Sequence, residues 1–497
     1  MNLSIKSFLP ILSNTAIVLA VICSTAYLLM LGFYNNLLLD DYCFVAEVDK
    51  GGAYGLMHSA YFGWQSRFSA FYVLGWILKI WGHSSNLLGY TIFLLMLGYG
   101  AVYYALRNIT RLDNRWMLWG CAILITNISI FAYFEFSTFY WVCCLLYTLS
   151  MYAAIVLFTA VFFSRGALWA RWLTVILCSL YICGGAENFT PIIIASLGII
   201  LLYQMVVNRT WQFWRTSQQQ MILVSLLILS IGFLVVVMGP GTHSRAEDMT
   251  GFMGHFSLSS YCYKLVAASS VFLMRLFSRT LYYVLLLPIG YVIGKQMNID
   301  LYANGIWKHI LLSLGILIFV IILSIAAPVF GMGWYSPLRS YSFVSFVMSI
   351  WFVFLGVICG SKYSEQTVDC LLIVSACFII TYSIYYYGKE QPLVKDYNEQ
   401  IVACKTAILG QIDAERTDPL ILQPVTHPVI PNTYAILRSS INRCLGKKNT
   451  SIAPPATYFP YEQFGLSKDP YNWKNEGVKQ YYNTQFDIIG WENTDYK

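Results

Sequence analysis

The chain has 497 residues, of which 58% are hydrophobic and 11% are charged, and its net charge is +7. Soluble proteins carry roughly 25% charged residues, so a chain with a mean hydropathy of +0.60 has too few charges to cover a fold in water. The composition excludes a soluble globular protein. The modest positive charge is the usual topology signal of a membrane protein and requires no nucleic-acid partner.

The first apolar run, "ILSNTAIVLAVICSTAYLLMLGFY", covers residues 11–34 and is longer than the apolar core of a signal peptide. No small-residue cleavage site follows it, which predicts a retained first helix. Runs of about 20 apolar residues match a bilayer core of about 30 Å, and about eleven such spans are predicted in all. The expected fold is therefore an all-α polytopic membrane protein. The further predicted spans cover residues 86–106, 116–134, 139–163, 172–187, 190–207, 219–238, 280–298, 309–328, 338–360 and 367–387.

The stretch "SRFSAFYVLGWILKIWGHSSN", residues 66–86, is predicted to lie in the outer membrane interface instead of crossing the bilayer. Trp76, Lys79 and Trp81 suit the headgroup region. With that choice the basic loop residues fall on one side, which predicts a cytoplasmic N-terminus. These basic residues are Lys6, Arg107, Arg111, Arg115, Arg165, Arg171, Arg209, Arg215, Lys295, Lys308 and Lys362.

Two parts of the chain are distinguished by composition. Residues 1–387 form the predicted membrane domain, with long external stretches at 34–85 and 239–279. Residues 388–497 are richer in proline, asparagine and tyrosine and predict a small, loop-rich external domain. A disulfide between Cys404 and Cys444 in this last part stays open, because spacing alone does not decide it.

The pair Asp40 and Asp41 directly follows the first predicted span. Two adjacent carboxylates repel each other, which suits a general base. A divalent metal ion would relieve the same repulsion. A hydrated polar stop after the first helix is the third reading. No Cys/His cluster with zinc spacing accompanies the pair, so we expect no cofactor, with a divalent ion at the two aspartates as the alternative.

Other polar residues lie at predicted outer helix ends, and three of them, Glu135, Glu187 and Arg339, stand alone among apolar neighbours. Charged residues at such positions are costly and mark functional sites. The alternative for each arginine is that it extends to lipid headgroups, and for each carboxylate that it marks the lipid–water boundary. Arginine recognises phosphate through its planar fork of donors. The arginines are Arg67, Arg245 and Arg339, and the others are Glu135, Glu187, Asn188 and His243.

Aromatic residues make up 17% of the chain, and 37 of them are tyrosines. Aromatic belts at the membrane surfaces account for part of this content. Aromatic rings also stack on the apolar faces of sugars, and composition alone does not separate the two uses.

The local sequences "LDDYCF", "YFGWQSRFSAFY", "GGAENFTP" and "GPGTHSRA" resemble those of the GT-C superfamily of integral-membrane glycosyltransferases. The order of a first helix, an external acidic pair and an interfacial helix is also similar to that superfamily. The size and the C-terminal segment resemble bacterial enzymes that modify O-antigen, including serotype-converting glucosyltransferases. The resemblance covers the membrane part loosely, and the acidic pair after the first helix is its most specific feature.

The resemblance implies an inverting transfer of a sugar from a polyprenyl-phosphate donor to a glycan acceptor, such as lipopolysaccharide. It places the chain in a bacterial inner membrane, in contact with lipids, with the C-terminal segment in the periplasm. Asp40 or Asp41 would be the catalytic base, with Asp41 slightly favoured. The arginines named above would bind the donor phosphate. Glu135, Glu187, Asn188, His243 and Tyr42 would contact the sugar or the acceptor.

Two other functions compete with this one. A transporter or flippase for a lipid-linked sugar would place charges in the middle of its spans, whereas the acidic residues here gather at span ends. A non-enzymatic membrane protein of glycan assembly would tolerate loss of the aspartate pair.

Overall fold

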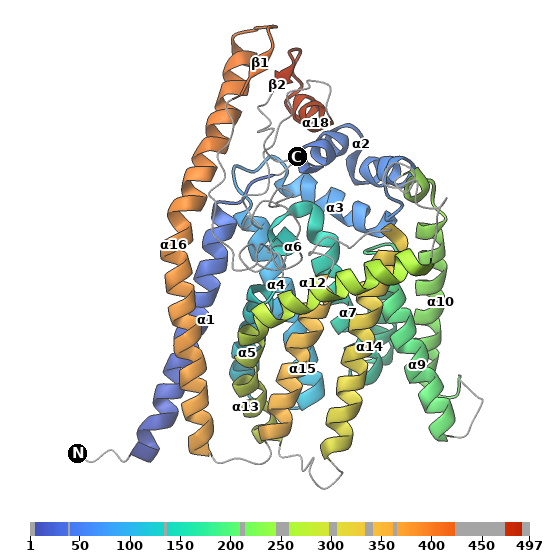
Figure 1. Ribbon diagram of the computed structural model, residues 1–497, viewed down its shortest axis with the longest axis vertical. Coiled ribbons are helices and arrows are strands. Elements are labelled where there is room, and N and C mark those ends of the chain that lie inside the picture. The colour runs from blue at the N-terminus through green and yellow to red at the C-terminus, as the bar shows by residue number, and fades with distance from the viewer. Residues whose placement is uncertain are drawn as a thin grey trace.

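The computed structural model describes residues 5–37, 40–133, 137–208, 214–244, 258–297, 306–332, 341–360, 365–422 and 473–489. These residues are almost entirely helical, which confirms the predicted all-α class (Figure 1). The helices are α1 (Ile5–Phe33), α2 (Asp40–Gly63), α3 (Phe68–Trp81), α4 (Leu88–Thr110), α5 (Arg115–Phe131), α6 (Ser137–Tyr140), the 3₁₀ turn η1 (Val142–Cys144), α7 (Leu145–Phe162), α8 (Leu168–Cys183), α9 (Thr190–Asn208), α10 (Ser217–Val237), α12 (Leu258–Val284), α13 (Leu287–Met297), α14 (Ile306–Met332), α15 (Ser342–Gly360), α16 (Glu365–Asp413) and α18 (Trp473–Tyr482).

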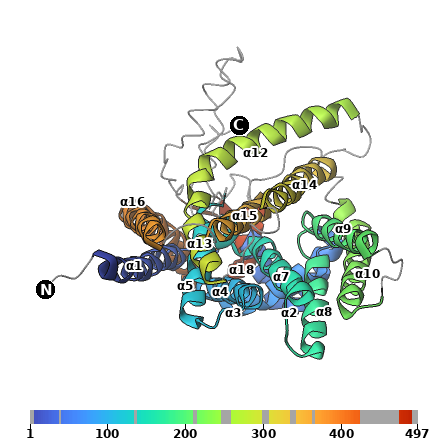
Figure 2. The same ribbon diagram turned by 90° about the horizontal axis from the view of Figure 1, so that it is seen from below.

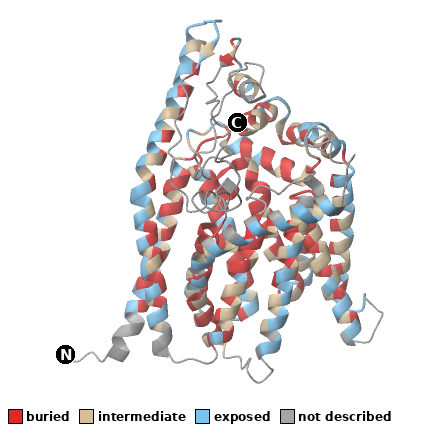
Figure 3. Cartoon of the chain, viewed as in Figure 1, coloured by how far each residue is buried: buried red, intermediate tan, exposed pale blue. Residues whose placement is uncertain are grey.

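Several helices are suited to a lipid environment. Within the described residues, six helices are long and apolar enough to cross a membrane, and further apolar helices are shorter. Leu227, Ile231 and Leu234 on α10 are exposed although they are strongly apolar, which is expected where the solvent is lipid. Buried residues gather in the middle of the bundle (Figure 3). The chain is therefore a helical membrane protein. The six candidate spans are Leu12–Phe33, Leu88–Thr110, Val142–Phe162, Ser217–Val237, Ser342–Gly360 and Asp369–Asp413.

Helices α1 and α16 lie side by side and run in the same direction (Figures 1 and 2). Ser13 bonds Asp369 near their beginnings, and the Tyr27 hydroxyl donates to Glu390 Oε2 further along, at 2.6 Å. With 49 residues, α16 is about 70 Å long, more than twice the thickness of a bilayer core. The boundary predicted at residue 388 therefore falls inside a continuous helix.

The predicted span at 280–298 is wrong in its local structure. Helix α12 continues to Val284, and the separate helix α13 begins at Leu287 after a short turn. In the two figures α12 crosses obliquely along one side of the bundle. Helix α13 packs closely on α15 because Gly290 and Gly356 let the two backbones approach, and a Cβ at Gly290 would meet the carbonyl of Val353. Small residues commonly bring membrane helices together in this way.

Helices α2 and α3 form a hairpin across one end of the bundle (Figure 1). The stretch 66–86 contains the helix α3, and its location in the membrane interface stays a prediction. Gly52 bends α2 with a φ of 66°, a conformation that favours glycine. A Cβ at Gly75 of α3 would lie 2.6 Å from Ala53 Cα, so the glycine permits close packing of the hairpin.

The described end of the chain returns to this hairpin. Strand β1 (Leu420–Ile421) pairs in parallel with β2 (Ile488–Ile489), and α18 packs against α2. Helices α2, α3 and α18 thus lie toward the same end of the bundle (Figure 1), and the first turn of α2 carries the predicted aspartate pair.

Candidate functional site

The predicted carboxylate pair begins helix α2. Asp40 and Asp41 occupy its first turn, where the partial positive charge of a helix N-terminus stabilises carboxylates. The interpretation of the pair as a stop after the first helix is therefore wrong, since α1 already ends at Phe33. The Asp41 side chain is fully buried, whereas that of Asp40 is half-buried.

A turn from another part of the chain holds this pair. The backbone N–H of Cys143, in the turn η1, donates to Asp41 Oδ1 at 3.0 Å. The Cys143 thiol also lies 3.9 Å from Asp40 Oδ2. A carboxylate that accepts a backbone N–H bond in a buried place has a fixed orientation. Asp41 is thus anchored, and Asp40 is the more accessible of the two carboxylates.

Arg67 stands directly before α3 and is 5% exposed. Its Nε and Nη2 donate to the two carboxylate oxygens of Glu187, both at 2.5 Å. The guanidinium also lies 6.0 Å from the centre of the Tyr147 ring. Burial by itself lowers the pKa of Arg67, but the charge of Glu187 outweighs this effect and holds the pKa above its ordinary value. The guanidinium is therefore charged and held in a fixed plane.

The turn after α8 brings Glu187 to Arg67. The backbone N–H of Ala70 donates to the Gly184 carbonyl at 3.2 Å, and the Ser69 hydroxyl donates to the Tyr181 carbonyl at 2.6 Å. A Cβ at Gly184 would lie 2.7 Å from Ser69 Oγ, so glycine permits this close approach. The sequences "GGAENFTP" and "YFGWQSRFSAFY", recognised separately, are in direct contact.

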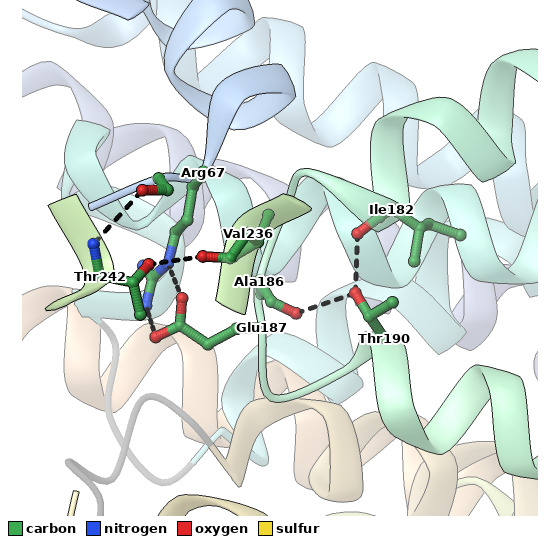
Figure 4. Close-up of polar contacts among 8 residues, drawn as sticks. Arg67, Ile182, Ala186, Glu187, Thr190, Val236 and Thr242 are labelled. Carbon is green, nitrogen blue, oxygen red and sulfur yellow. Dashed lines mark hydrogen bonds and ion pairs between the residues drawn. The ribbon is translucent and has the colours of Figure 1, made fainter. Parts of the chain in front are cut away.

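The other end of the same turn is fixed by its own hydrogen bonds. The Thr190 hydroxyl, at the start of α9, donates to the Ile182 carbonyl at 2.9 Å and also lies 3.5 Å from the Ala186 carbonyl (Figure 4). Asn188 is half-buried within this turn. The position of Glu187 thus follows from a rigid turn between two helices.

The turn that follows α10 contacts the same corner. The backbone N–H of Thr242 donates to Ser66 Oγ at 3.3 Å, and its hydroxyl donates to the Val236 carbonyl at 2.7 Å (Figure 4). A Cβ at Gly239 would overlap Ser66, and one at Gly241 would lie 2.6 Å from the Tyr61 carbonyl. The turn of the sequence "GPGTHSRA" therefore supports the residues next to Arg67.

The remaining predicted residues have different outcomes. His243 has an exposed side chain. Tyr42 is 1% exposed and meets the Tyr481 ring edge-on, with ring centres 5.1 Å apart; burial raises its pKa well above the ordinary value. The prediction that Tyr42 contacts a sugar is corrected here, because its ring packs inside the protein. The residues Glu135, Arg245, Arg339 and Cys444 lie outside the described residues.

Several neighbours of the site were not predicted from sequence. The backbone amide of Cys143 has no sequence signal, and Tyr147 and Tyr481 belong to aromatic runs that also suit a membrane belt. Within the described part of the chain, no group of three His, Cys, Asp or Glu side chains has the arrangement of a metal site.

Comparisons with protein-family models, curated proteins and solved structures give no match to this chain. The interpretation of the site therefore depends on its geometry and on the residues that compose it.

Proposed function

We propose that the chain is a membrane glycosyltransferase that moves a sugar from a polyprenyl-phosphate donor to a cell-surface glycan. The observation that carries the proposal is the anchored carboxylate pair at the start of α2. The Arg67–Glu187 pair supports it, because one segment, η1–α7, contacts both parts of the site. Cys143 of this segment bonds Asp41, and the Tyr147 ring lies under the Arg67 guanidinium.

The two aspartates differ in exposure, and this difference assigns them different roles. An acceptor hydroxyl has to reach its base, and the half-buried Asp40 offers more access than the fully buried Asp41. In this scheme Asp40 removes the proton while the hydroxyl oxygen attacks the anomeric carbon. The bond from that carbon to the phosphate oxygen breaks, and polyprenyl phosphate leaves. Asp41, anchored on Cys143, positions the turn.

Arg67 stabilises the charge that develops on the departing phosphate. Glu187 accepts one N–H from Nε and one from Nη2, so the N–H groups of Nη1 and the second N–H of Nη2 are the donors for a phosphate oxygen. Glu187 then orients the arginine and does not bind sugar directly. Arg245, Arg339, Glu135, Asn188 and His243 remain candidates for the phosphate or the sugar from their sequence positions.

The proposed topology has about eleven spans in a bacterial inner membrane, with the N-terminus in the cytoplasm. It places the hairpin α2–α3 and the segment from about residue 388 on the periplasmic side. A lipid-linked donor is expected there because nucleotide sugars are cytoplasmic. The acceptor is lipopolysaccharide or a similar surface glycan, and the scheme requires no cofactor.

The test uses cells that lack the intact gene and carry Asp40→Asn, Asp41→Asn or both substitutions, at matched protein levels. We expect loss of surface-glycan modification with Asp40→Asn and reduced modification with Asp41→Asn. Normal modification by the double variant would refute the catalytic role of the pair and favour a transporter or a non-enzymatic assembly protein.

A further inference from the structure

Lys405 lies on the part of α16 that extends beyond the end of α1. Its side chain is half-buried, and its Nζ donates to the Asn36 side-chain oxygen at 3.1 Å. Asn36 belongs to the segment that follows α1 and is 4% exposed. The ammonium group is therefore held close to the connection that leads into the carboxylate pair.

Asn36 is fixed in the orientation that serves Lys405. Its Nδ2 donates to the Asn398 side-chain oxygen at 2.6 Å and to the Tyr34 carbonyl at 3.2 Å. Because both hydrogens of the amide have acceptors, its oxygen is directed at the lysine. The side-chain amide of Asn36, which is neutral, thus holds the Lys405 ammonium in one place.

The charge of Lys405 is not balanced within the described residues. An ammonium group has three donors, and the described contacts provide one neutral acceptor and no carboxylate within 4.0 Å. Other lysines differ: Lys395 pairs with Glu399 at 3.8 Å, and Lys479 pairs with Asp487 at 2.8 Å. A partly buried cation is costly without an anion, which makes an anionic ligand the natural partner.

Lys405 is also linked to the candidate site through its neighbours. Tyr42, next to Asp41, meets the Tyr481 ring of α18 edge-on, with ring centres 5.1 Å apart, and Asn36, which accepts from Lys405, lies four positions before Asp40 in the sequence. Helix α18 packs on α2, and Lys405 of α16 contacts the segment that leads from α1 toward α2.

We propose that Lys405, held by Asn36, binds the phosphate group of a lipid. The identification of that lipid as the sugar donor rests on the proposed glycosyltransferase function. The alternative source of the same chemistry is the headgroup of a membrane phospholipid. The two remaining N–H donors of the ammonium would bond the phosphate oxygens.

The test measures binding of farnesyl phosphate to the purified full-length chain in a neutral detergent, with farnesol as the ligand that lacks the phosphate. We expect Lys405→Gln to weaken farnesyl phosphate binding about tenfold and to leave farnesol unaffected. Lys405→Arg should keep most of the binding because it keeps the charge. Lys395→Gln, an exposed lysine on the same helix, is the control and should bind as the parent chain does.

Competition with phosphatidylglycerol separates the two sources. If farnesyl phosphate stays bound in the presence of an equal concentration of phosphatidylglycerol, the site selects a prenyl-linked phosphate. If phosphatidylglycerol displaces it, the site holds a phospholipid headgroup. Both results support a lipid-phosphate site. Equal binding by Lys405→Gln and the parent chain would overturn it. The assay involves no sugar transfer, so its failure is distinct from failure of the Asp40 test.

Discussion

Arg67 and Glu187 lie 120 positions apart in the sequence and are joined by two parallel N–H···O bonds. Arg67 is buried and Glu187 is 30% exposed, so breaking this pair leaves one charge without its partner and costs about 1–3 kcal/mol. We expect Arg67→Gln and Glu187→Gln each to lower the free energy of unfolding by about this amount. The double variant should lose less than the sum of the two. Thermal unfolding in detergent measures this coupling, with Arg165→Gln, at an exposed position, as control. Additive effects would contradict a coupled pair.

Gly241→Ala tests the contact between the turn after α10 and the end of α2. The new methyl group would lie 2.6 Å from the Tyr61 carbonyl, and backbone atoms there cannot move aside. We expect a loss of about 1–3 kcal/mol in the free energy of unfolding. The matched control is Gly198→Ala in α9, where nothing lies within 4 Å; it should keep or raise stability, because alanine favours helices. Equal stability of the two variants would argue against the contact.

Tyr481→Ala tests whether α18 shields the first turn of α2. Burial first, and then the charge of Asp40, raises the pKa of Cys43 in this turn to about 11. The thiol is therefore protonated at neutral pH, and its alkylation should accelerate as the pH rises toward 11. The Tyr481 ring packs on Tyr42, the neighbour of Cys43. Removal of the ring should therefore loosen this turn and speed alkylation of Cys43 at pH 8, as measured by peptide mass spectrometry.

Gln485→Ala is the control for that experiment, since Gln485 is exposed on the same C-terminal segment. Its alkylation rate at Cys43 should equal that of the parent chain. An unchanged rate in Tyr481→Ala would mean that α18 does not protect the turn.

Single cysteines at Asp49 and Asp113 test the topology, in a chain whose native cysteines are replaced. Both positions are exposed, and they lie on opposite sides of the membrane in the proposed arrangement. A membrane-impermeant thiol reagent added to whole cells with a permeabilised outer membrane should label Asp49→Cys and not Asp113→Cys. Labelling of both positions, or of Asp113→Cys alone, would contradict the orientation.

Sequence reasoning succeeded where the signal is local. Apolar runs predicted helices such as α4 and α10 within a few residues, because length and hydropathy decide what crosses a bilayer. The same reasoning failed where structure continues through a change of composition. Residue 388 looked like a boundary, but α16 continues to Asp413 and includes Pro392, since contacts with α1 such as the Tyr27–Glu390 hydrogen bond hold the helix on either side of residue 388.

The candidate site was predicted in its residue types but not in its pairing. The sequence singled out Glu187 by its apolar neighbours and Arg67 by its place at the head of the predicted interfacial helix, whereas their bidentate contact depends on the turn at Gly184 meeting α3. The backbone amide of Cys143 is independent of side-chain identity, so no sequence pattern could indicate it. Its bond to Asp41 reverses the slight preference for Asp41 as the base.

The central claim is a sugar transfer that depends on Asp40. Its most direct measurement is product formation by the purified chain supplied with a polyprenyl-phosphate sugar and a glycan acceptor, with and without a chelator. A metal-free transferase with Asp40 as base should form product from the lipid-linked donor and not from a nucleotide sugar, with or without the chelator. Asp40→Asn should then reduce the rate at least about 100-fold. Full activity of a folded Asp40→Asn variant, or no transfer by the parent chain, would contradict the assignment.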